Sequence, residues 1–190
     1  PVAMIGFGDS ALVVHPSFPV KTVKDLIELA RRRPGEIFYA SSGIGGFPHM
    51  NTELFKLKTG VNLVHVPFKG GGPAIADVMA GHTQLNFSSL VTAVPHVQSG
   101  RLRLVATGGP RRDPKYSTVP TIAETVPGYE SRIWWGIFAP PKTPPDIIAR
   151  FHAETTDAIS APLFQKRLDE QGGAVVKMSS VDFGKLMVSE

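Results

Sequence analysis

The most constraining feature of this sequence is a unit that recurs along most of its length: a short apolar strand, a turn rich in glycine or serine, and then a helix. A helix between two strands carries the chain back to the end where the first strand began, so the two strands run parallel. The recurring unit therefore predicts an α/β fold with a mostly parallel, doubly wound sheet. The expected strands are residues 11–14, 37–40, 61–66, 83–87 and 102–107, and the expected helices are residues 22–33, 47–59, 73–80 and 90–98.

Local signals mark where these helices begin and end. Thr22 followed by Asp25 predicts a capping box, in which each side chain accepts a hydrogen bond from the other residue's backbone N–H. Gly60 follows the second helix, as is typical of a left-handed C-terminal residue. The apolar residues at helical spacing in this second helix are Phe47, Met50, Leu54 and Leu57.

The pattern changes after residue 108. Turn signals dominate residues 108–130, with one short helix expected near Ile122, and an aromatic strand follows at residues 133–138. Two prolines and then Asp146 mark a strong helix start. The other expected elements are helices at residues 146–160 and 161–171, a strand at residues 174–177 and a helix from Ser180. We place a lobe boundary near Ser131.

Three of the turns that follow strands carry the candidate chemistry. Each places glycine or serine between the carboxyl end of a strand and the start of a helix, where backbone N–H groups are unpaired and the helix dipole is positive. Any one of these turns alone is more simply an ordinary capped turn, but three on one rim indicate a binding site for a ligand with one or more carboxylates. The candidate ligand-binding residues are Ser42, Gly43, Gly45, Gly46, His49, Lys69, Gly70, Gly71, Gly72, Ser88 and Ser89.

Enzyme and metal motifs are not matched. A dinucleotide-binding fingerprint would need glycine where Pro48 stands, and a P-loop would need its lysine after the glycines, whereas Lys69 precedes them. The six histidines show no metal-ligand spacing, and the chain has no cysteine. We therefore predict no metal, no cofactor and no enzymatic activity. His49 lies beside a candidate turn and could touch a ligand, whereas His65 lies within an expected strand and is interpreted as structural.

Composition narrows the class of partner. Of the 190 residues, 42% are hydrophobic and 19% charged, as in ordinary globular proteins. The net charge is +4, but the basic residues are scattered and not interleaved with aromatic ones, which argues against nucleic acid and modestly favours an anionic ligand. No apolar run is long enough to cross a bilayer, and the first residues do not resemble a signal peptide. Either the protein is cytoplasmic, or the given sequence starts downstream of the N-terminus of the natural protein.

A series of motifs resembles one family over nearly the whole chain. The first is the string at residues 39–49, and the most specific is the segment at residues 65–74, with its lysine followed by three glycines. In order and spacing these motifs resemble the solute-binding receptors of the tripartite tricarboxylate transporters, also called Bug or TctC proteins. The resemblance implies a type II periplasmic-binding-protein architecture, with two α/β lobes joined by a hinge. It also implies a small dicarboxylate, tricarboxylate, amino acid or aromatic carboxylate as ligand, a periplasmic location and membrane transporter subunits as partners.

The resemblance also implies a division of the chain and two departures from the family. Residues 8–131 would be the inner ligand-binding lobe, and residues 1–7 with 132–190 the C-terminal portion of the other lobe. Family members are longer at the N-terminus, so we expect this other lobe to be incomplete and the chain to dimerise through its exposed surface. Ser88 stands where an acidic residue is common in the family, which weakens the inference of an amino-acid ligand.

Two alternative functions remain open at this point. A ligand-sensing module for a signalling partner would use the same capture chemistry as a transport receptor. An enzyme could reuse the two-lobed fold with Ser42, Ser88 or His49 in catalysis, but it would need a nucleophile and a base within hydrogen-bond reach.

Overall fold

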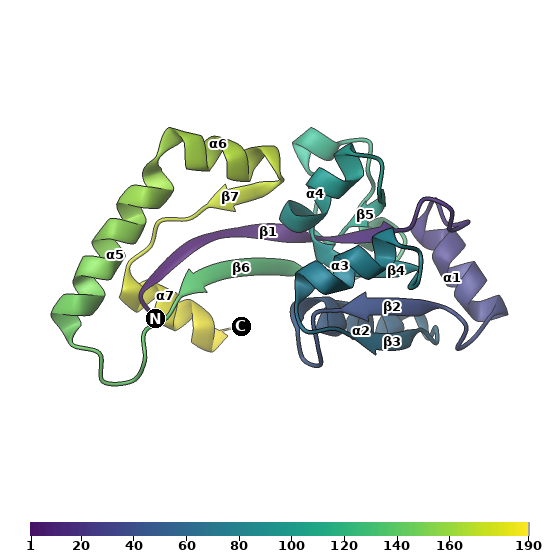
Figure 1. Ribbon diagram of the computed structural model, residues 1–190, viewed down its shortest axis with the longest axis horizontal. Coiled ribbons are helices and arrows are strands. Elements are labelled where there is room, and N and C mark those ends of the chain that lie inside the picture. Colours follow the sequence, from purple (N-terminus) through teal and green to yellow (C-terminus); the bar gives the residue numbers. More distant parts are fainter. Residues whose placement is uncertain (190) are drawn as a thin grey trace. The chain divides into compact units, whose positions relative to one another are not determined.

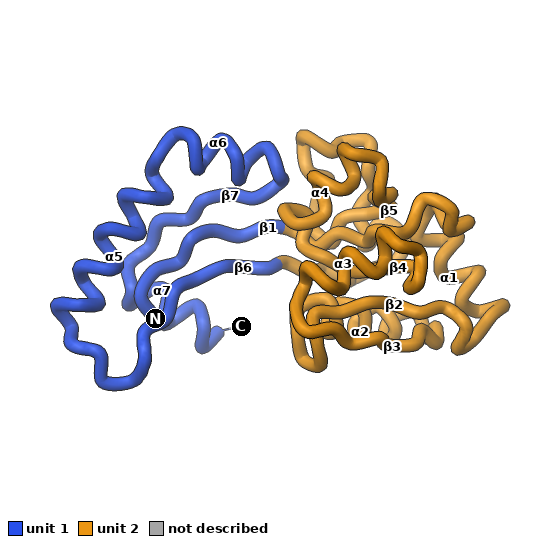
Figure 2. The backbone as a smooth tube through the Cα atoms, viewed as in Figure 1, with its two compact units in different colours: residues 1–8, 133–190 blue, residues 9–132 orange. Residues whose placement is uncertain are grey.

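The computed structural model describes residues 1–189 and divides into two compact units (Figures 1 and 2). One unit comprises residues 9–132, and the other comprises residues 1–8 and 133–190. The assignment of these units to an inner lobe and to part of a second lobe stays a prediction. None of the helices in the described part of the chain is long and apolar enough to cross a membrane.

A mixed sheet forms the centre of the larger unit, with strands in the order β3-β2-β4-β1-β5. β2 runs parallel to β3 and β4, whereas β1 runs antiparallel to β4 and β5, so β1 is the one reversed strand among these five. The prediction of a mostly parallel sheet is confirmed. The strands are β1 (Ala3–Val14), β2 (Phe38–Ser41), β3 (Val64–Pro67), β4 (Leu85–Ser89) and β5 (Arg103–Thr107).

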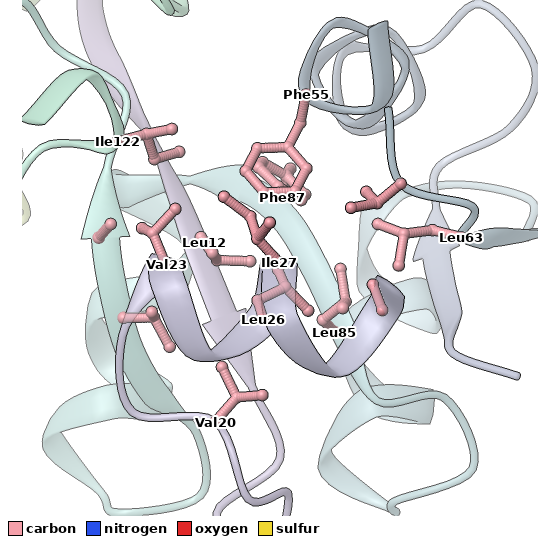
Figure 3. Packing of buried hydrophobic residues seen from close by; sticks show 14 of the residues in the cluster. Leu12, Val20, Val23, Leu26, Ile27, Phe55, Leu63, Leu85, Phe87 and Ile122 are labelled. Carbon is pink, nitrogen blue, oxygen red and sulfur yellow. The ribbon is translucent and has the colours of Figure 1, made fainter. Parts of the chain in front are cut away.

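Helices cover both faces of this sheet, because β1 buries alternate side chains in two separate cores. Leu12 and Val14 join the core under α1 and α2, and Ala11 and Val13 join the core under α3 and α4. In Figure 3 the α1 side chains point at the β1 and β4 residues of the first core. The helices are α1 (Val23–Arg32), α2 (Phe47–Thr59), α3 (Gly71–Met79) and α4 (Leu90–Gln98), and two short 3₁₀ turns follow at Pro114–Tyr116 and Ile122–Glu124.

The start of α1 has the predicted capping box. Thr22 Oγ1 accepts from the N–H of Asp25 at 3.1 Å, and the Asp25 carboxylate accepts from the N–H of Thr22 at 2.9 Å. The N–H of Lys21, which donates to the same carboxylate at 3.0 Å, lowers the pKa of Asp25, and Thr22 adds to this shift. Two N–H groups that the helix leaves unpaired are thereby satisfied.

The buried face of α2 is not the one suggested by its apolar spacing. Met50 and Leu57 are 56% and 82% exposed, whereas Phe55 is fully buried beside Phe87 (Figure 3). The Phe55 ring lies 5.2 Å from that of Phe87 and 6.3 Å from that of Tyr129, between centroids. The polar residue Asn51 is also buried, because its side-chain oxygen accepts from Ser131 Oγ. Partners supplied by distant segments outweigh helical periodicity here.

The smaller unit is built on the first residues of β1. β6 (Arg132–Ile137) and β7 (Gly173–Val175) both pair with β1, and α5 (Pro145–Ser160), α6 (Pro162–Glu170) and α7 (Ser180–Ser189) complete the unit. Trp134, Phe138 and Phe183 form an aromatic cluster with centroid separations of 5.3 to 6.2 Å. Gly136 makes room for it, since a Cβ there would lie 2.2 Å from the Phe183 ring. The expected strand at residues 11–14 is only the C-terminal part of β1. The N-terminal half was not predicted, because glycines and Asp9 are poor strand formers.

Truncating the buried and the exposed apolar residue of α2 tests this assignment. We expect Phe55→Ala to lower the free energy of unfolding by about 3–5 kcal/mol, because it removes a fully buried ring and leaves a cavity. Leu57→Ala, on the same helix, should change it by less than about 0.5 kcal/mol. Urea denaturation of the two variants decides between the faces, and the reverse order of losses would contradict the packing described here.

Candidate ligand-binding site

Parallel pairing brings the first two candidate turns together at one edge of the sheet. β2 and β3 end at Ser41 and Pro67, which are register partners, and the chain leaves each strand toward a helix. The N–H of Phe68 donates to the Ser41 carbonyl at 2.9 Å, and the N–H of Gly70 donates to the Ser42 carbonyl at 3.3 Å. The two turns therefore form one continuous backbone surface.

The turn between β2 and α2 depends on its glycines. Gly43 and Gly45 have φ values of 123° and 77°, a region that other residues rarely adopt. Gly46 is required for a different reason, because a Cβ there would lie 2.6 Å from Ser42 Oγ. Gly46 is the N-cap of α2, and no side chain caps this helix start.

The turn between β3 and α3 is the most open of the three. Gly70, with φ of 113°, is the N-cap of α3, and no side chain caps the helix. Gly71 and Gly72 are exposed, and a Cβ on either would meet no atom within 4 Å. The start of α3 therefore has no side-chain cap and no side chain at Gly71 or Gly72 to cover it, and it lies at the positive end of the helix dipole. Lys69, also exposed, adds a positive charge beside them.

The third turn differs from the other two. Ser88 and Ser89 are the last residues of β4 and are 6% and 7% exposed. Ser89 Oγ accepts from the N–H of Thr92 at 3.2 Å and bonds to Thr92 Oγ1 at 2.7 Å, so it caps α4. One of the unpaired N–H groups at the start of α4 is thus bound by a side chain of the protein itself, whereas no side chain caps α2 or α3. Contact of either serine with a ligand stays a prediction.

His49 lies in the first turn of α2 and holds the first candidate turn. Its Nδ1 accepts from the N–H of Gly45 at 3.2 Å. Its ring is tilted against that of His65, with 4.3 Å between the centroids. The structure therefore gives His49 a local hydrogen bond, and its contact with a ligand also stays a prediction.

A polar cluster behind the first turn was not recognised in the sequence. The Tyr39 hydroxyl donates to Glu53 Oε1 at 2.7 Å, and Lys56 Nζ donates to the same oxygen at 2.8 Å. Tyr39 also stacks on His65, with 4.8 Å between centroids and 15° between planes. A sequence pattern could have predicted the cluster, because His49, Glu53 and Lys56 follow the i, i+4, i+7 spacing that places side chains on one face of a helix.

Burial and charge shift the pKa values within this cluster. Burial, together with the hydrogen bond to Glu53, raises the pKa of Tyr39. The pKa of Glu53 is lowered even though burial opposes this, because Lys56 and Tyr39 donate to its carboxylate. Partial burial, and then the neighbouring His49, lower the pKa of His65. The neutral form of His65 is therefore favoured in the folded chain.

The arrangement does not favour nucleophilic catalysis. At this edge the serine bonded to a histidine is Ser41, whose Oγ lies 2.5 Å from His65 Nε2. Ser41 is fully buried, so a substrate cannot reach it. Among the described residues, no group of three or more histidine, aspartate or glutamate side chains is placed to hold a metal ion.

Further residues at the same edge of the sheet were also missed. β5 ends at Thr107 and is followed by Gly108, where a Cβ would collide with Ser10 Oγ. Asp9 lies beside this turn, and its carboxylate accepts from Arg132 Nε at 3.1 Å. Burial raises the pKa of Asp9 although Arg132 opposes the shift. A glycine next to a partly exposed ion pair carries no recognisable spacing in the sequence.

The lowered pKa of His65 predicts how stability depends on pH. The unfolded chain binds a proton at His65 near pH 6.5, whereas the folded chain does so only at lower pH. The contribution of His65 to the free energy of unfolding is therefore present in full above about pH 6.5, and it is lost as the pH falls through the pKa of the folded chain. We expect His65→Phe to lose this part of the pH dependence.

Urea denaturation from about pH 8 to about pH 5 measures the effect. His82→Phe is the control, because the His82 side chain is 75% exposed and lies on a different loop. This variant should keep the wild-type dependence. The same slope in wild type and His65→Phe would contradict the assignment.

Known proteins resemble this chain along its whole length. Residues 1–190 match the family described as the tripartite tricarboxylate transporter family receptor. Protein BugT of Bordetella pertussis is 31% identical over 93% of this chain and 54% of its own length. The chain thus spans about half the length of such curated relatives.

Solved structures show the same fold. R. palustris Rpa4515 with adipate is 35% identical, with a TM-score of 0.93 over 100% of this chain and 64% of that one. The periplasmic binding protein BugD is 27% identical, with a TM-score of 0.86 over 93% of this chain and 59% of that one. The periplasmic-binding-protein architecture expected from the sequence is confirmed. With the family matched from end to end, the chain belongs to the tripartite tricarboxylate transporter receptors, the Bug or TctC proteins.

Proposed function

We propose that this chain is the ligand-binding part of a receptor that captures a small organic carboxylate for a tripartite tricarboxylate-type transporter. One observation carries the proposal: two helix starts without side-chain caps, those of α2 and α3, meet at one edge of the sheet. Their turns are joined by the hydrogen bond from the N–H of Gly70 to the Ser42 carbonyl.

The chemistry of this edge fits an anion. Helix starts offer N–H donors and a partial positive charge, and glycine allows a ligand oxygen to approach the backbone closely. Ser42 adds a hydroxyl donor and Lys69 a positive charge. Of the eleven candidates, we assign the direct ligand contacts first to the residues of the first two turns. We assign a secondary part to Ser88 and Ser89, whose hydroxyls lie at the end of the adjacent strand β4.

The family supports the rest of the proposal. R. palustris Rpa4515 was solved with adipate, a dicarboxylate, and all 190 residues of this chain are covered by the likeness. We propose that residues 9–132 form the inner lobe and that residues 1–8 with 133–190 form part of the second lobe of a two-lobed receptor. Such a receptor works in the periplasm and delivers its ligand to membrane transporter subunits. It captures the acid without transforming it.

Direct binding measurements test this function. We expect the full natural protein to bind at least one acid from a panel of adipate, malate, citrate and benzoate, and its melting temperature to rise with the concentration of that acid. Isothermal titration calorimetry gives the affinity. Acetamide, which has no carboxylate, is the control and should produce no shift. A lack of response to every acid in the panel would refute the proposal.

Gly72→Ala separates binding from folding. The added methyl group meets no protein atom within 4 Å, and alanine favours a helix more than glycine does, so stability should be unchanged or higher by up to about 1 kcal/mol. The methyl group does, however, occupy the space above the α3 start, so we expect acid affinity to fall about tenfold or more. Gly184→Ala, in α7 of the other unit, is the matched control and should leave affinity unchanged. Wild-type affinity in Gly72→Ala would place the ligand elsewhere.

We also propose that the 190-residue chain associates with itself. The smaller unit exposes several large apolar side chains, which favour association: Phe151, Leu163, Val181 and Val188 are 59%, 61%, 68% and 90% exposed. We expect light scattering to show a mass that rises toward a dimer with concentration. A compact monomer at high concentration would contradict this.

A further inference from the structure

A continuous series of contacts links the surface of α2 to the glycine turn after β2. Lys56 and Tyr39 both donate to Glu53, Tyr39 stacks on His65, and His65 bonds to Ser41 at the base of the turn. The series crosses three elements, since its members come from α2, β2 and β3. It ends on the turn that the proposed function assigns to the carboxylate.

Ser41 fixes the base of this turn. Its hydroxyl accepts from the N–H of Gly43 at 3.1 Å and approaches the Gly43 carbonyl at 3.2 Å. Gly43 has the left-handed φ of 123°, so this residue would otherwise have wide conformational freedom. The buried hydroxyl of Ser41 therefore selects one conformation of the turn.

His65 in turn fixes Ser41 from the neighbouring strand. His65 Nε2 lies within hydrogen-bond distance of Ser41 Oγ, at 2.5 Å, and Tyr39 stacks on the His65 ring from the side of β2. His65 stands two residues before the end of β3, the strand that leads into the second turn. It thus lies where the bases of both candidate turns meet.

His65 also contacts the turn through a second side chain, His49. The His65 ring contacts the His49 ring at 4.3 Å, and His49 Nδ1 accepts from the N–H of Gly45. Gly45 also has a left-handed φ, of 77°. Both flexible glycines of the turn are therefore held by side chains that contact His65, one through Ser41 and the other through His49.

We propose that His65 is a positioning residue of the carboxylate site, which keeps the β2–α2 turn in its binding conformation through Ser41 and His49. This inference rests on the proposed function for the part that concerns the ligand. A glycine-rich turn loses conformational freedom when it closes on a ligand, and holding it in place beforehand removes that cost from binding. Interpreting His65 as merely structural overlooked this link, because the contact with Ser41 exists only between paired strands.

The groups that face His65 are His49, Glu53 and Lys56 from α2 and Tyr39 from β2. Glu53 is already bound by Lys56 and Tyr39. Glu53 is therefore not free to pair with a protonated His65, whose positive charge would lie against the His49 ring. We expect the turn to lose its fixed conformation as the pH falls through the titration of His65.

Three variants separate positioning from folding. His65→Phe keeps a ring between Tyr39 and His49 but removes the bond to Ser41. His65→Gln restores a side-chain nitrogen that can reach Ser41 Oγ. His82→Phe is the matched control, because His82 lies on the loop after α3 and bonds to Asp77 near the end of that helix, away from both turns.

Two readouts are applied to the full natural protein. Calorimetry with adipate, or with the panel acid that binds most tightly, should show about a tenfold loss of affinity in His65→Phe. Most of this loss should be recovered in His65→Gln, with no loss in His82→Phe. In ¹⁵N spectra, the Gly43 and Gly45 amide signals should move with a common pH midpoint in wild type and in His82→Phe but not in His65→Phe. The Gly60 amide is the internal reference.

The outcomes distinguish this inference from the proposed function. Wild-type affinity in His65→Phe, or Gly43 and Gly45 amide signals that ignore the substitution, would overturn the positioning role. An affinity loss in His65→Gln equal to that in His65→Phe would also overturn it, because the nitrogen would then be irrelevant. If the wild-type protein binds no acid, the proposed function fails, and the amide signals still decide whether His65 holds the turn.

Discussion

The parallel pairing of β2 with β3 is the constraint on which the site depends. In this register Tyr39 lies opposite His65 and Ser41 opposite Pro67, so both strands end at the same edge. The turn after each strand then lies beside the other, close enough for the N–H of Gly70 to reach the Ser42 carbonyl. A shift by one residue would place Tyr39 and His65 on opposite faces and separate His65 from Ser41. The same pairing that builds the sheet therefore builds the candidate site.

The site combines flexible backbone with firm support. Glycines at positions 43, 45 and 70 have positive φ values that other residues rarely adopt, and each glycine adds conformational freedom that opposes order. Buried polar side chains offset this, with Ser41 holding Gly43 and His49 holding Gly45. The open start of α3 has no such side-chain cap. The first turn is thus held in shape from behind, while the second offers the less obstructed donors.

Sequence reasoning succeeded where the signal was local and failed where it depended on distant partners. The Thr22 capping box, the length of α2 and the three turns after strands follow from short-range rules, and the structure has all of them. The buried face of α2 does not follow from such rules, because Phe55 packs on Phe87 and Tyr129, far along the chain. The capping of α4 by Ser89 is local, since its partner Thr92 is three residues away, but the sequence analysis counted Ser89 as a candidate ligand contact instead.

By itself, the sequence determined the family, the alternation of strands and helices, and the three glycine- and serine-rich turns that follow strands. These properties depend on residue types at short spacing, where backbone geometry leaves few choices. Only the tertiary structure decided that two of the three helix starts lack a side-chain cap. It also decided that a histidine within a strand lies against the base of the first candidate turn. The physical reason is that strand register and helix packing set which side chains meet, and both are fixed by contacts between residues far apart in the chain.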